Sequence, residues 1–183
     1  TVGVMVLISV SAGASLCIEG FNGLELIGLS PLTGFISATV NTRELAPLIA
    51  AWALGAQVGC RFTAQIGSMR LSEEIDAISV MAIEPIPFLV TTRLIATLFA
   101  IVPLYLIGLI GSYIAAKLSV TLLFHQPVGT YLHYFEAFLS PIDILISLGK
   151  ILIFTMVIVM IHCWFGFTAT GGPAGVGEAT GRA

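Results

Sequence analysis

The amino-acid sequence predicts an all-α protein that crosses a membrane several times. Hydrophobic residues make up 57% of its 183 residues and charged residues only 9%, whereas soluble domains carry about 25% charged residues. The apolar residues also form long stretches, and about 20 such residues are enough for a helix to cross the hydrocarbon core of a bilayer. The chain therefore has too few charges to cover a water-facing surface, and its apolar faces are expected to contact lipid.

Four apolar stretches organise residues 1–183 as a single transmembrane domain. We expect spans at about residues 2–18, 39–69, 88–118 and 142–167. After the first span, Gly20, Asn22 and Gly23 are typical of a turn. Residues 119–140 are amphipathic and are expected to form an extracytoplasmic segment. The chain starts inside an apolar stretch and stops in a glycine-rich one, so we expect it to be a fragment of a longer membrane protein.

The placement of Lys and Arg predicts the orientation of these spans. Arg70 and Arg93 bracket the middle connector and Arg182 lies in the final tail, whereas residues 19–38 and 119–140 contain no Lys or Arg. Cytoplasmic segments carry an excess of these residues. The middle connector and the tail are therefore predicted to be cytoplasmic. Lys117 lies near the outer end of the third span, where its side chain can reach the headgroups.

The middle connector contains a predicted short helix over residues 72–83. Ser72 is the expected N-cap, and the acidic residues Glu73, Glu74 and Asp76 fill the first turn, where the helix dipole favours negative charge. Ile75, Ile78 and Met81 recur at helical spacing and form an apolar stripe, and two prolines, Pro85 and Pro87, are expected to end the helix. One interpretation is a helix that rests on the headgroups. Such helices usually carry Lys and Arg on their polar face, so the acidic face favours docking to another protein.

Several polar residues lie within the predicted spans. Arg43 and Glu44 are adjacent at the start of the second span, and charges at membrane depth are by default a functional hypothesis. The alternative is a charged pair at the water interface. Lys150 lies near the middle of the fourth span, two turns from Asp143, so we predict that it pairs across helices. Polar side chains that face lipid are costly. Three more polar residues of the second span are therefore expected to face protein, water or an interface: Gln57, Arg61 and Gln65.

Two further features predict packing within the spans. Gly55 and Gly59 form a weak GxxxG match, which favours close approach of helices. His162 is interpreted as a packed or an interfacial histidine.

Other classes of function find little support in the sequence. The formal net charge of −3 offers no basic surface for nucleic acid. His125 and His133 lack further ligands for a metal, no P-loop or nucleophile motif is present, and no cofactor is predicted. The three cysteines, Cys17, Cys60 and Cys163, lie within apolar segments and are interpreted as buried hydrophobic residues. Enzymatic activity is therefore not expected of the chain itself.

Four motifs in order along the chain resemble a known family. They read Arg43-Glu44-Leu45-Ala46-Pro47, Ala64-Gln65-Ile66-Gly67-Ser68-Met69, Glu73-Glu74-Ile75-Asp76-Ala77 and Met81-Ala82-Ile83-Glu84-Pro85. This series is similar to the MlaE/YrbE permeases, the membrane subunits of bacterial lipid-transporting ABC systems that work with MCE-domain proteins. The connector is most similar to the actinobacterial YrbE branch. Residues 171–182 resemble the loop before the family's last membrane helix, so the resemblance implies that an N-terminal interfacial helix and a final span lie outside this sequence.

The resemblance implies a multi-pass permease of the bacterial inner (cytoplasmic) membrane. It implies pairing with a second permease subunit, identical or paralogous, and binding to a cytoplasmic ATPase that supplies ATP hydrolysis. The residues expected to couple to that ATPase lie in the connector: Glu73, Glu74, Asp76, Ile78 and Met81. A lipid cavity open toward the MCE proteins is expected to involve Phe21, Glu44 and Leu45. Gln65 stands where many members of the family carry Glu, so a charge-related role does not carry over to this position.

Two alternatives from other classes of protein remain at this stage. In a secondary transporter or ion channel, Glu44, Arg61 and Lys150 would line an ion or proton path. A passive membrane scaffold would need no such path. The sequence predicts neither the lipid nor the direction of transport, because an apolar cavity needs few specific polar groups.

Overall fold

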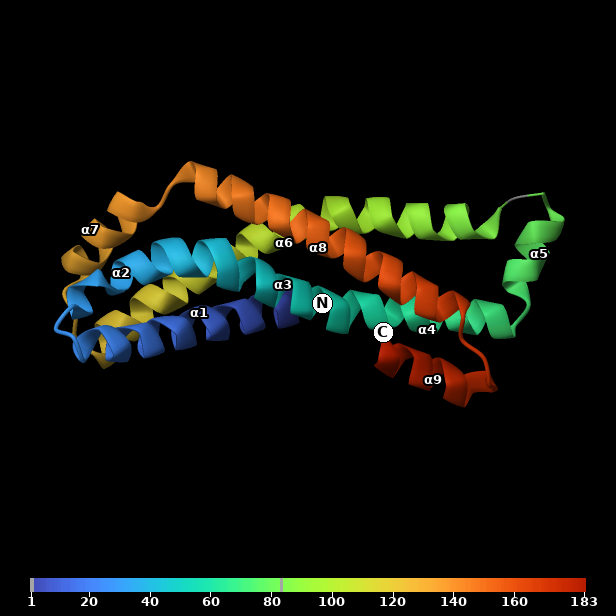
Figure 1. The fold of residues 1–183 in the computed structure, drawn as a ribbon, viewed down its shortest axis with the longest axis horizontal. Coiled ribbons are helices and arrows are strands. Elements are labelled where there is room, and N and C mark those ends of the chain that lie inside the picture. The colour runs from blue at the N-terminus through green and yellow to red at the C-terminus, as the bar shows by residue number, and fades with distance from the viewer. Residues whose placement is uncertain (1, 83) are drawn as a thin grey trace. The chain divides into compact units, whose positions relative to one another are not determined.

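The computed structural model describes residues 2–82 and 84–183, and every regular element of these residues is a helix (Figure 1). Within this part of the chain, four helical segments are long and apolar enough to cross a membrane: Val2–Glu25, Ser30–Leu71, Pro85–Leu123 and Pro141–Phe167. The predicted all-α, polytopic fold class is thereby confirmed.

The second of these segments is a composite of different helix types. It joins η1 (Ser30–Leu32), α2 (Thr33–Ile36), η2 (Ser37–Leu45), α3 (Ala46–Leu54), η3 (Gly55–Gly59) and α4 (Cys60–Leu71). Both η2 and η3 are π-helical, a geometry that often marks functional sites. The remaining elements are α1 (Val2–Glu25), α5 (Glu74–Val80), α6 (Pro85–Leu123), α7 (Val128–Phe138), α8 (Pro141–Phe167) and α9 (Gly172–Arg182).

The chain divides into two compact units, each with its own core. Unit 1 comprises residues 51–101 and 152–183, and unit 2 comprises residues 2–50 and 102–151. The divisions fall within the spans rather than between them, so α3, α6 and α8 each contribute residues to both units.

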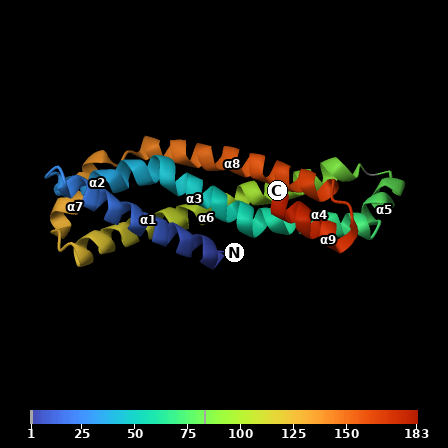
Figure 2. The same cartoon turned by 60° about the horizontal axis from the view of Figure 1, so that its bottom comes forward.

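The core of unit 2 joins α1, α6 and α7. It contains Cys17, Phe21, Ala116, Val120 and Tyr131, and the ring of Phe21 stacks on that of Phe124 with centroids 4.1 Å apart. Burial raises the pKa of the Tyr131 hydroxyl above its ordinary range, so this side chain remains a neutral part of the core. Helix α2 lies beside α7 (Figure 2) because Gly34 has no side chain to meet the Tyr131 carbonyl.

The core of unit 1 joins α4, α5, α6 and α8. Its buried members are Ile66, Ile75, Leu89, Val159 and Cys163. Helix α9 lies alongside α4, and a methyl group at Gly67 would come within 2.9 Å of the Val176 side chain. Glycine at this position therefore permits the close approach of α9.

The first span continues as a helix past the predicted turn. Helix α1 runs on to Glu25, and the chain reverses only around Gly28, which has a φ of +73°. Packing explains the difference, because Phe21 is buried in the core and Gly20 lies against Ile36, whose Cδ1 atom would be 2.8 Å from an added Cβ. Tertiary contacts thus hold in a helix residues whose local propensity favours a turn. Helix α6 likewise extends past the predicted limit at 118, to Leu123.

The connector helix is shorter than predicted and begins differently. Helix α5 covers Glu74–Val80, and Ser72 caps the end of α4 instead of the start of α5, which makes the predicted N-cap wrong. Glu73 has a left-handed backbone with a φ of 59°. Pro85 begins α6 and does not end α5, since proline fits the first turn of a helix, where no N–H bond is required. Residue Ile83 lies outside the described residues.

Candidate functional site

Four consecutive polar residues of η2 bind neighbouring helices of unit 2. The first two contact α6: Asn41 donates from Nδ2 to the Ser112 hydroxyl at 2.9 Å, and the Thr42 and Tyr113 hydroxyls lie 2.5 Å apart. These bonds satisfy polar groups inside a membrane span, where water is absent and an unsatisfied group costs several kcal/mol. They hold η2 in a fixed register against α6.

The next two residues form ion pairs with α8. The Arg43 guanidinium lies 2.8 Å from the Asp143 carboxylate, and the Lys150 ammonium lies 2.6 Å from the Glu44 carboxylate. Lys150 also donates to the Arg43 carbonyl at 2.8 Å. The prediction that Lys150 pairs across helices is confirmed. We call Arg43, Glu44, Asp143 and Lys150 the charge quartet.

The two pairs differ in burial, so they are expected to differ in energy. The Asp143 side chain is 4% exposed and depends on Arg43, which is 52% exposed. The Lys150 and Glu44 side chains are 33% and 70% exposed. Removing the partner of a buried charge is costly, whereas exposed pairs contribute little. The Arg43–Asp143 pair is therefore the structural member of the quartet, and Glu44 is the member free to interact with other molecules.

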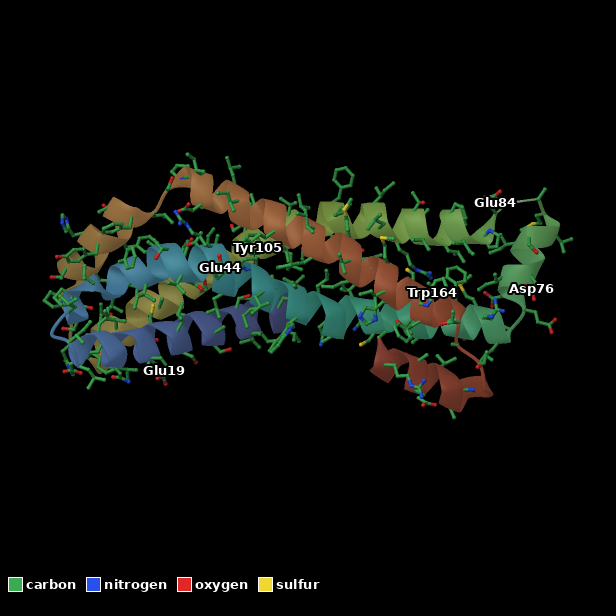
Figure 3. The ribbon with its side chains drawn as sticks, in the orientation of Figure 1. Glu19, Glu44, Asp76, Glu84, Tyr105 and Trp164 are labelled. Atoms are coloured by element: carbon green, nitrogen blue, oxygen red, sulfur yellow. The ribbon has the colours of Figure 1, made fainter. Side chains whose placement is uncertain are left out.

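A cavity of about 500 Å³ borders the charge quartet. Its walls come from helices α2, η2, α7 and α8 and from Ser140, which lies between α7 and α8. The lining residues are Phe35, Thr39, Val40, Arg43, Glu44, Ala137, Phe138, Ser140 and Asp143. Figure 3 shows Glu44 on this part of the chain. The walls thus combine aromatic and aliphatic groups with three charged side chains, a composition suited to an amphipathic molecule.

Only one of the predicted cavity residues lines this cavity. Glu44 does so, whereas Leu45 is half-buried beside it and Phe21 is stacked on Phe124 in the core of unit 2. The π-helical geometry of η2 helps to place Arg43 and Glu44 together. A π-turn holds more residues than an α-turn, so consecutive side chains diverge less and both can reach α8.

The predicted coupling residues lie on or beside α5 with their acidic groups exposed. Glu73, Glu74 and Asp76 are all exposed, and Figure 3 shows Asp76 on this helix. The apolar stripe divides along its length, because Ile75 packs into the core of unit 1, Ile78 is half-buried and Met81 is 64% exposed. The start of the stripe thus anchors the helix, and its end presents an apolar group beside acidic ones.

A polar contact joins α4 and α8 within unit 1. The Thr63 hydroxyl lies 3.0 Å from Nδ1 of His162 and donates to the His162 carbonyl at 2.9 Å. Both residues are buried, so the structure favours the packed over the interfacial interpretation of His162. Gly59 lies directly against its ring, so one glycine of the GxxxG match does serve close packing.

Replacing Gly59 with alanine should destabilise the protein by about 1–3 kcal/mol, the typical cost of overpacking a well-packed interior. A methyl group at this position would overlap the His162 ring. Gly149→Ala is the matched control, since no atom lies within 4 Å of its added methyl group. Unfolding of both variants in detergent micelles measures the difference, and equal stability would contradict the proposed contact.

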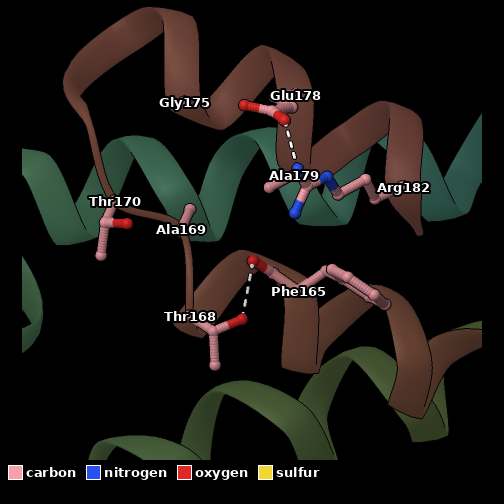
Figure 4. Close-up of a pocket in the computed structure, with 8 residues that line it drawn as sticks. All are labelled: Phe165, Thr168, Ala169, Thr170, Gly175, Glu178, Ala179 and Arg182. Atoms are coloured by element: carbon pink, nitrogen blue, oxygen red, sulfur yellow. Dashed lines mark hydrogen bonds and ion pairs between the residues drawn. The ribbon is translucent and has the colours of Figure 1, made fainter.

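A second, smaller cavity lies between the end of α8 and α9 (Figure 4). It measures about 170 Å³ and is bordered by the ion pair between Glu178 and Arg182. Across residues 2–82 and 84–183, no three His, Cys, Asp or Glu side chains converge in a way that could hold a metal ion.

Sequence reasoning missed the residues that hold η2 to α6 and the partner of Arg43. Asn41 and Thr42 directly precede the charged pair Arg43 and Glu44. Such a run of polar residues in an apolar span indicates contacts with polar groups of other helices. No spacing rule, however, links them to Ser112 and Tyr113, which lie on a distant part of the chain.

Comparisons with known proteins extend over the whole chain. The family described as "Permease MlaE" matches residues 1–183. The chain is 30% identical to Protein TRIGALACTOSYLDIACYLGLYCEROL 1, chloroplastic, of Arabidopsis thaliana, over 98% of this chain and 51% of that protein. A probable ABC transporter permease protein of Rickettsia felis is 30% identical over 92% of this chain and 65% of its own length. A probable ABC transporter permease protein of Synechocystis is 34% identical over 84% of this chain and 58% of its own length. The chain thus spans between half and two thirds of these relatives.

Proposed function

The chain belongs to the MlaE permease family, and from this premise we propose that it is the membrane subunit of an ABC-type lipid transporter. In this proposal it works with an MCE-protein assembly, and a separate cytoplasmic ATPase supplies ATP hydrolysis. The family match over residues 1–183 is the observation that carries the proposal. Relatives described as ABC transporter permeases support the ABC class, and the plant relative, named for a galactolipid, supports a lipid as the substrate.

We propose a bacterial cytoplasmic membrane as the location and a second permease subunit, identical or paralogous, as the partner in the membrane. The connector is then cytoplasmic, as the placement of Arg70 and Arg93 predicts. The cavity beside the charge quartet is proposed to receive lipid: its aromatic and aliphatic walls suit acyl chains, and Glu44, Arg43 and Asp143 offer polar contacts. Leu45 follows Glu44 in η2 and is half-buried, and Phe21 would support the fold from the core of unit 2.

The connector helix is proposed to bind the ATPase. Glu73, Glu74 and Asp76 present exposed carboxylates, and Ile78 and Met81 supply apolar area next to them. Ile75 fixes α5 to the core of unit 1, so a force applied to α5 acts directly on α4, α6 and α8. This arrangement suits a helix that transmits movement from a soluble partner to the membrane spans.

Changing Glu74 and Asp76 together to lysine should abolish co-purification of the ATPase. Both side chains are exposed, and Glu74 accepts one hydrogen bond, from the exposed Ser72 hydroxyl at 3.1 Å. The double charge reversal therefore acts chiefly on the docking surface. The matched control is Glu19→Lys with Glu25→Lys, an equal change of charge on exposed residues of α1. Retention of the ATPase by the α5 variant would overturn the coupling role.

The alternative of an ion channel gains no observation from the structure. Glu44 and Lys150 neutralise each other. Ion flux through liposomes that contain the purified permease alone would nevertheless favour this alternative over an ATP-driven permease.

A further inference from the structure

Two aromatic rings form an apolar wall of the cavity beside the charge quartet. Phe35 belongs to α2 and Phe138 to α7, and both residues line this cavity. Their ring centroids lie 4.9 Å apart at an interplanar angle of 80°, the edge-to-face arrangement that aromatic pairs prefer. The two residues are 37% and 45% exposed. Each ring of this aromatic pair therefore restricts the other and still offers surface to a molecule in the cavity.

The backbone that carries Phe35 is held in place on both sides. Thr33, before it, and Ser37, after it, are completely buried. A methyl group at Gly34 would overlap the carbonyl oxygen of Tyr131, so the backbones of α2 and α7 are in direct contact (Figure 1). Protein interiors are close-packed and do not deform continuously. The two helices therefore keep the aromatic pair at a fixed position in the wall.

The charged wall of the same cavity can adapt its shape. Arg43 and Glu44 have side chains that are 52% and 70% exposed, and long charged side chains have many rotamers. They can therefore move to suit different molecules, whereas the aromatic pair cannot. Specificity often depends on a clash with the wrong molecule as well as on contacts with the right one. In this cavity, the aromatic pair is the part that can reject a molecule by its shape.

The aromatic pair lies close to the charges. Phe35 precedes Arg43 by eight residues, or at most about 12 Å along the helix, and Phe138 precedes Asp143 by five. The cavity volume of about 500 Å³ is in the range of sites for a drug-sized ligand and is smaller than a lipid with two long acyl chains. A lipid whose head group lies at the charges therefore places the first carbons of its chains against the rings.

We propose that Phe35 and Phe138 determine which lipids the permease accepts, by limiting the bulk of the acyl chains next to the head group. This inference rests on the proposed function, in which the cavity receives lipid. A chain that is unbranched near the head group fits alongside the rings, whereas a methyl branch at that position overlaps them. The far ends of the chains lie outside the cavity, so branches at the far ends are accepted.

Two lipids that differ only in the position of a methyl branch test this proposal. One carries the branch at the third carbon of each acyl chain, and the other carries it at the carbon before the chain end. ATP-driven transfer of an equimolar mixture by the complete transporter should favour the second lipid by about tenfold, the lower end of what a hydrophobic pocket achieves for one carbon. Phe35→Ala and Phe138→Ala should each bring this ratio close to one. Phe99→Ala, at an exposed position of α6 in unit 1, is the matched control and should keep the wild-type ratio.

The outcomes separate a wrong role of the rings from a wrong proposed function. Equal transfer of both lipids by the wild-type permease, or a preference that survives in both alanine variants, would overturn the role of the aromatic pair and leave lipid transport intact. Native mass spectrometry of the full-length permease in nanodiscs measures the same ratio for bound lipid, without ATP. If no lipid is transferred, the proposed function fails, and the ratio of bound lipids still decides whether the rings select by shape. Absence of bound lipid as well would overturn both.

Discussion

Replacing Arg43 with alanine should lower the free energy of unfolding by about 3 kcal/mol, the lower end of the range for removing one partner of a buried ion pair. The Asp143 side chain is 4% exposed, and its carboxylate lies 2.8 Å from the Arg43 guanidinium. Without that cation, a charged carboxylate remains inside a membrane span with no opposing charge, or it must take up a proton. The lower end of the range applies because Arg43 itself is half-exposed.

A double-mutant cycle checks this assignment. Arg43→Ala combined with Asp143→Ala should be less destabilised than the sum of the two single variants, because neither leaves a lone charge when both are absent. Lys150→Ala provides the matched control within the charge quartet. Its partner Glu44 is 70% exposed and keeps access to solvent, so the cost should stay below about 1 kcal/mol. Unfolding of the purified protein in mixed micelles measures all four variants, and equal effects of Arg43→Ala and Lys150→Ala would contradict the difference in burial.

Hydrophobic composition made the fold class predictable, whereas the ends of the helices depended on tertiary contacts. Residues such as Gly20 and Asn22 favour a turn when read locally. In the folded chain Gly20 packs against Ile36 and Phe21 enters the core, so continuing the helix gains more burial than ending it. The turn forms instead at Gly28, where positive φ costs glycine little.

The connector shows a second limit of local reasoning. Local rules predict an N-cap at Ser72, a first helical turn at the three acidic residues and the end of the helix at the two prolines. The structure places Glu73 in a left-handed conformation before α5 and uses Pro85 to begin the next helix. Each residue type occurs at a position that its chemistry allows, but the sequence permits more than one such arrangement. Which one forms depends on where Ile75 finds the core of unit 1.

The candidate site was predictable in part, because charged residues are costly in an apolar span and therefore indicate a specific role or partner. That reasoning identified Arg43, Glu44 and Lys150 and the need for a contact across helices. It did not identify Asp143 as the partner of Arg43, and it did not foresee η2. A π-helical turn depends on the balance between backbone hydrogen bonds and side-chain contacts with α6 and α8, which no local pattern records.

Replacing Glu44 with arginine should reduce lipid transport by about tenfold or more while leaving assembly intact. This result is expected because the substitution converts the exposed end of the charge quartet from negative to positive. The new cation would lie beside Lys150 and next to Arg43, and close like charges repel each other. A tenfold loss corresponds to about 1.4 kcal/mol, a modest demand on such a change. ATP-driven lipid transfer by the complete transporter in proteoliposomes is the measurement.

A charge exchange distinguishes a functional role of Glu44 from a structural one. Glu44→Lys combined with Lys150→Glu restores an opposite-charge pair between η2 and α8 but moves the negative group to a less exposed position. If Glu44 acts only by pairing with Lys150, the exchange should recover both stability and transport. If Glu44 contacts the transported lipid in the cavity, stability should recover and transport should stay low. Normal co-purification of the ATPase and the partner subunit in both variants is required for either conclusion, and normal transport by Glu44→Arg would remove Glu44 from the lipid path.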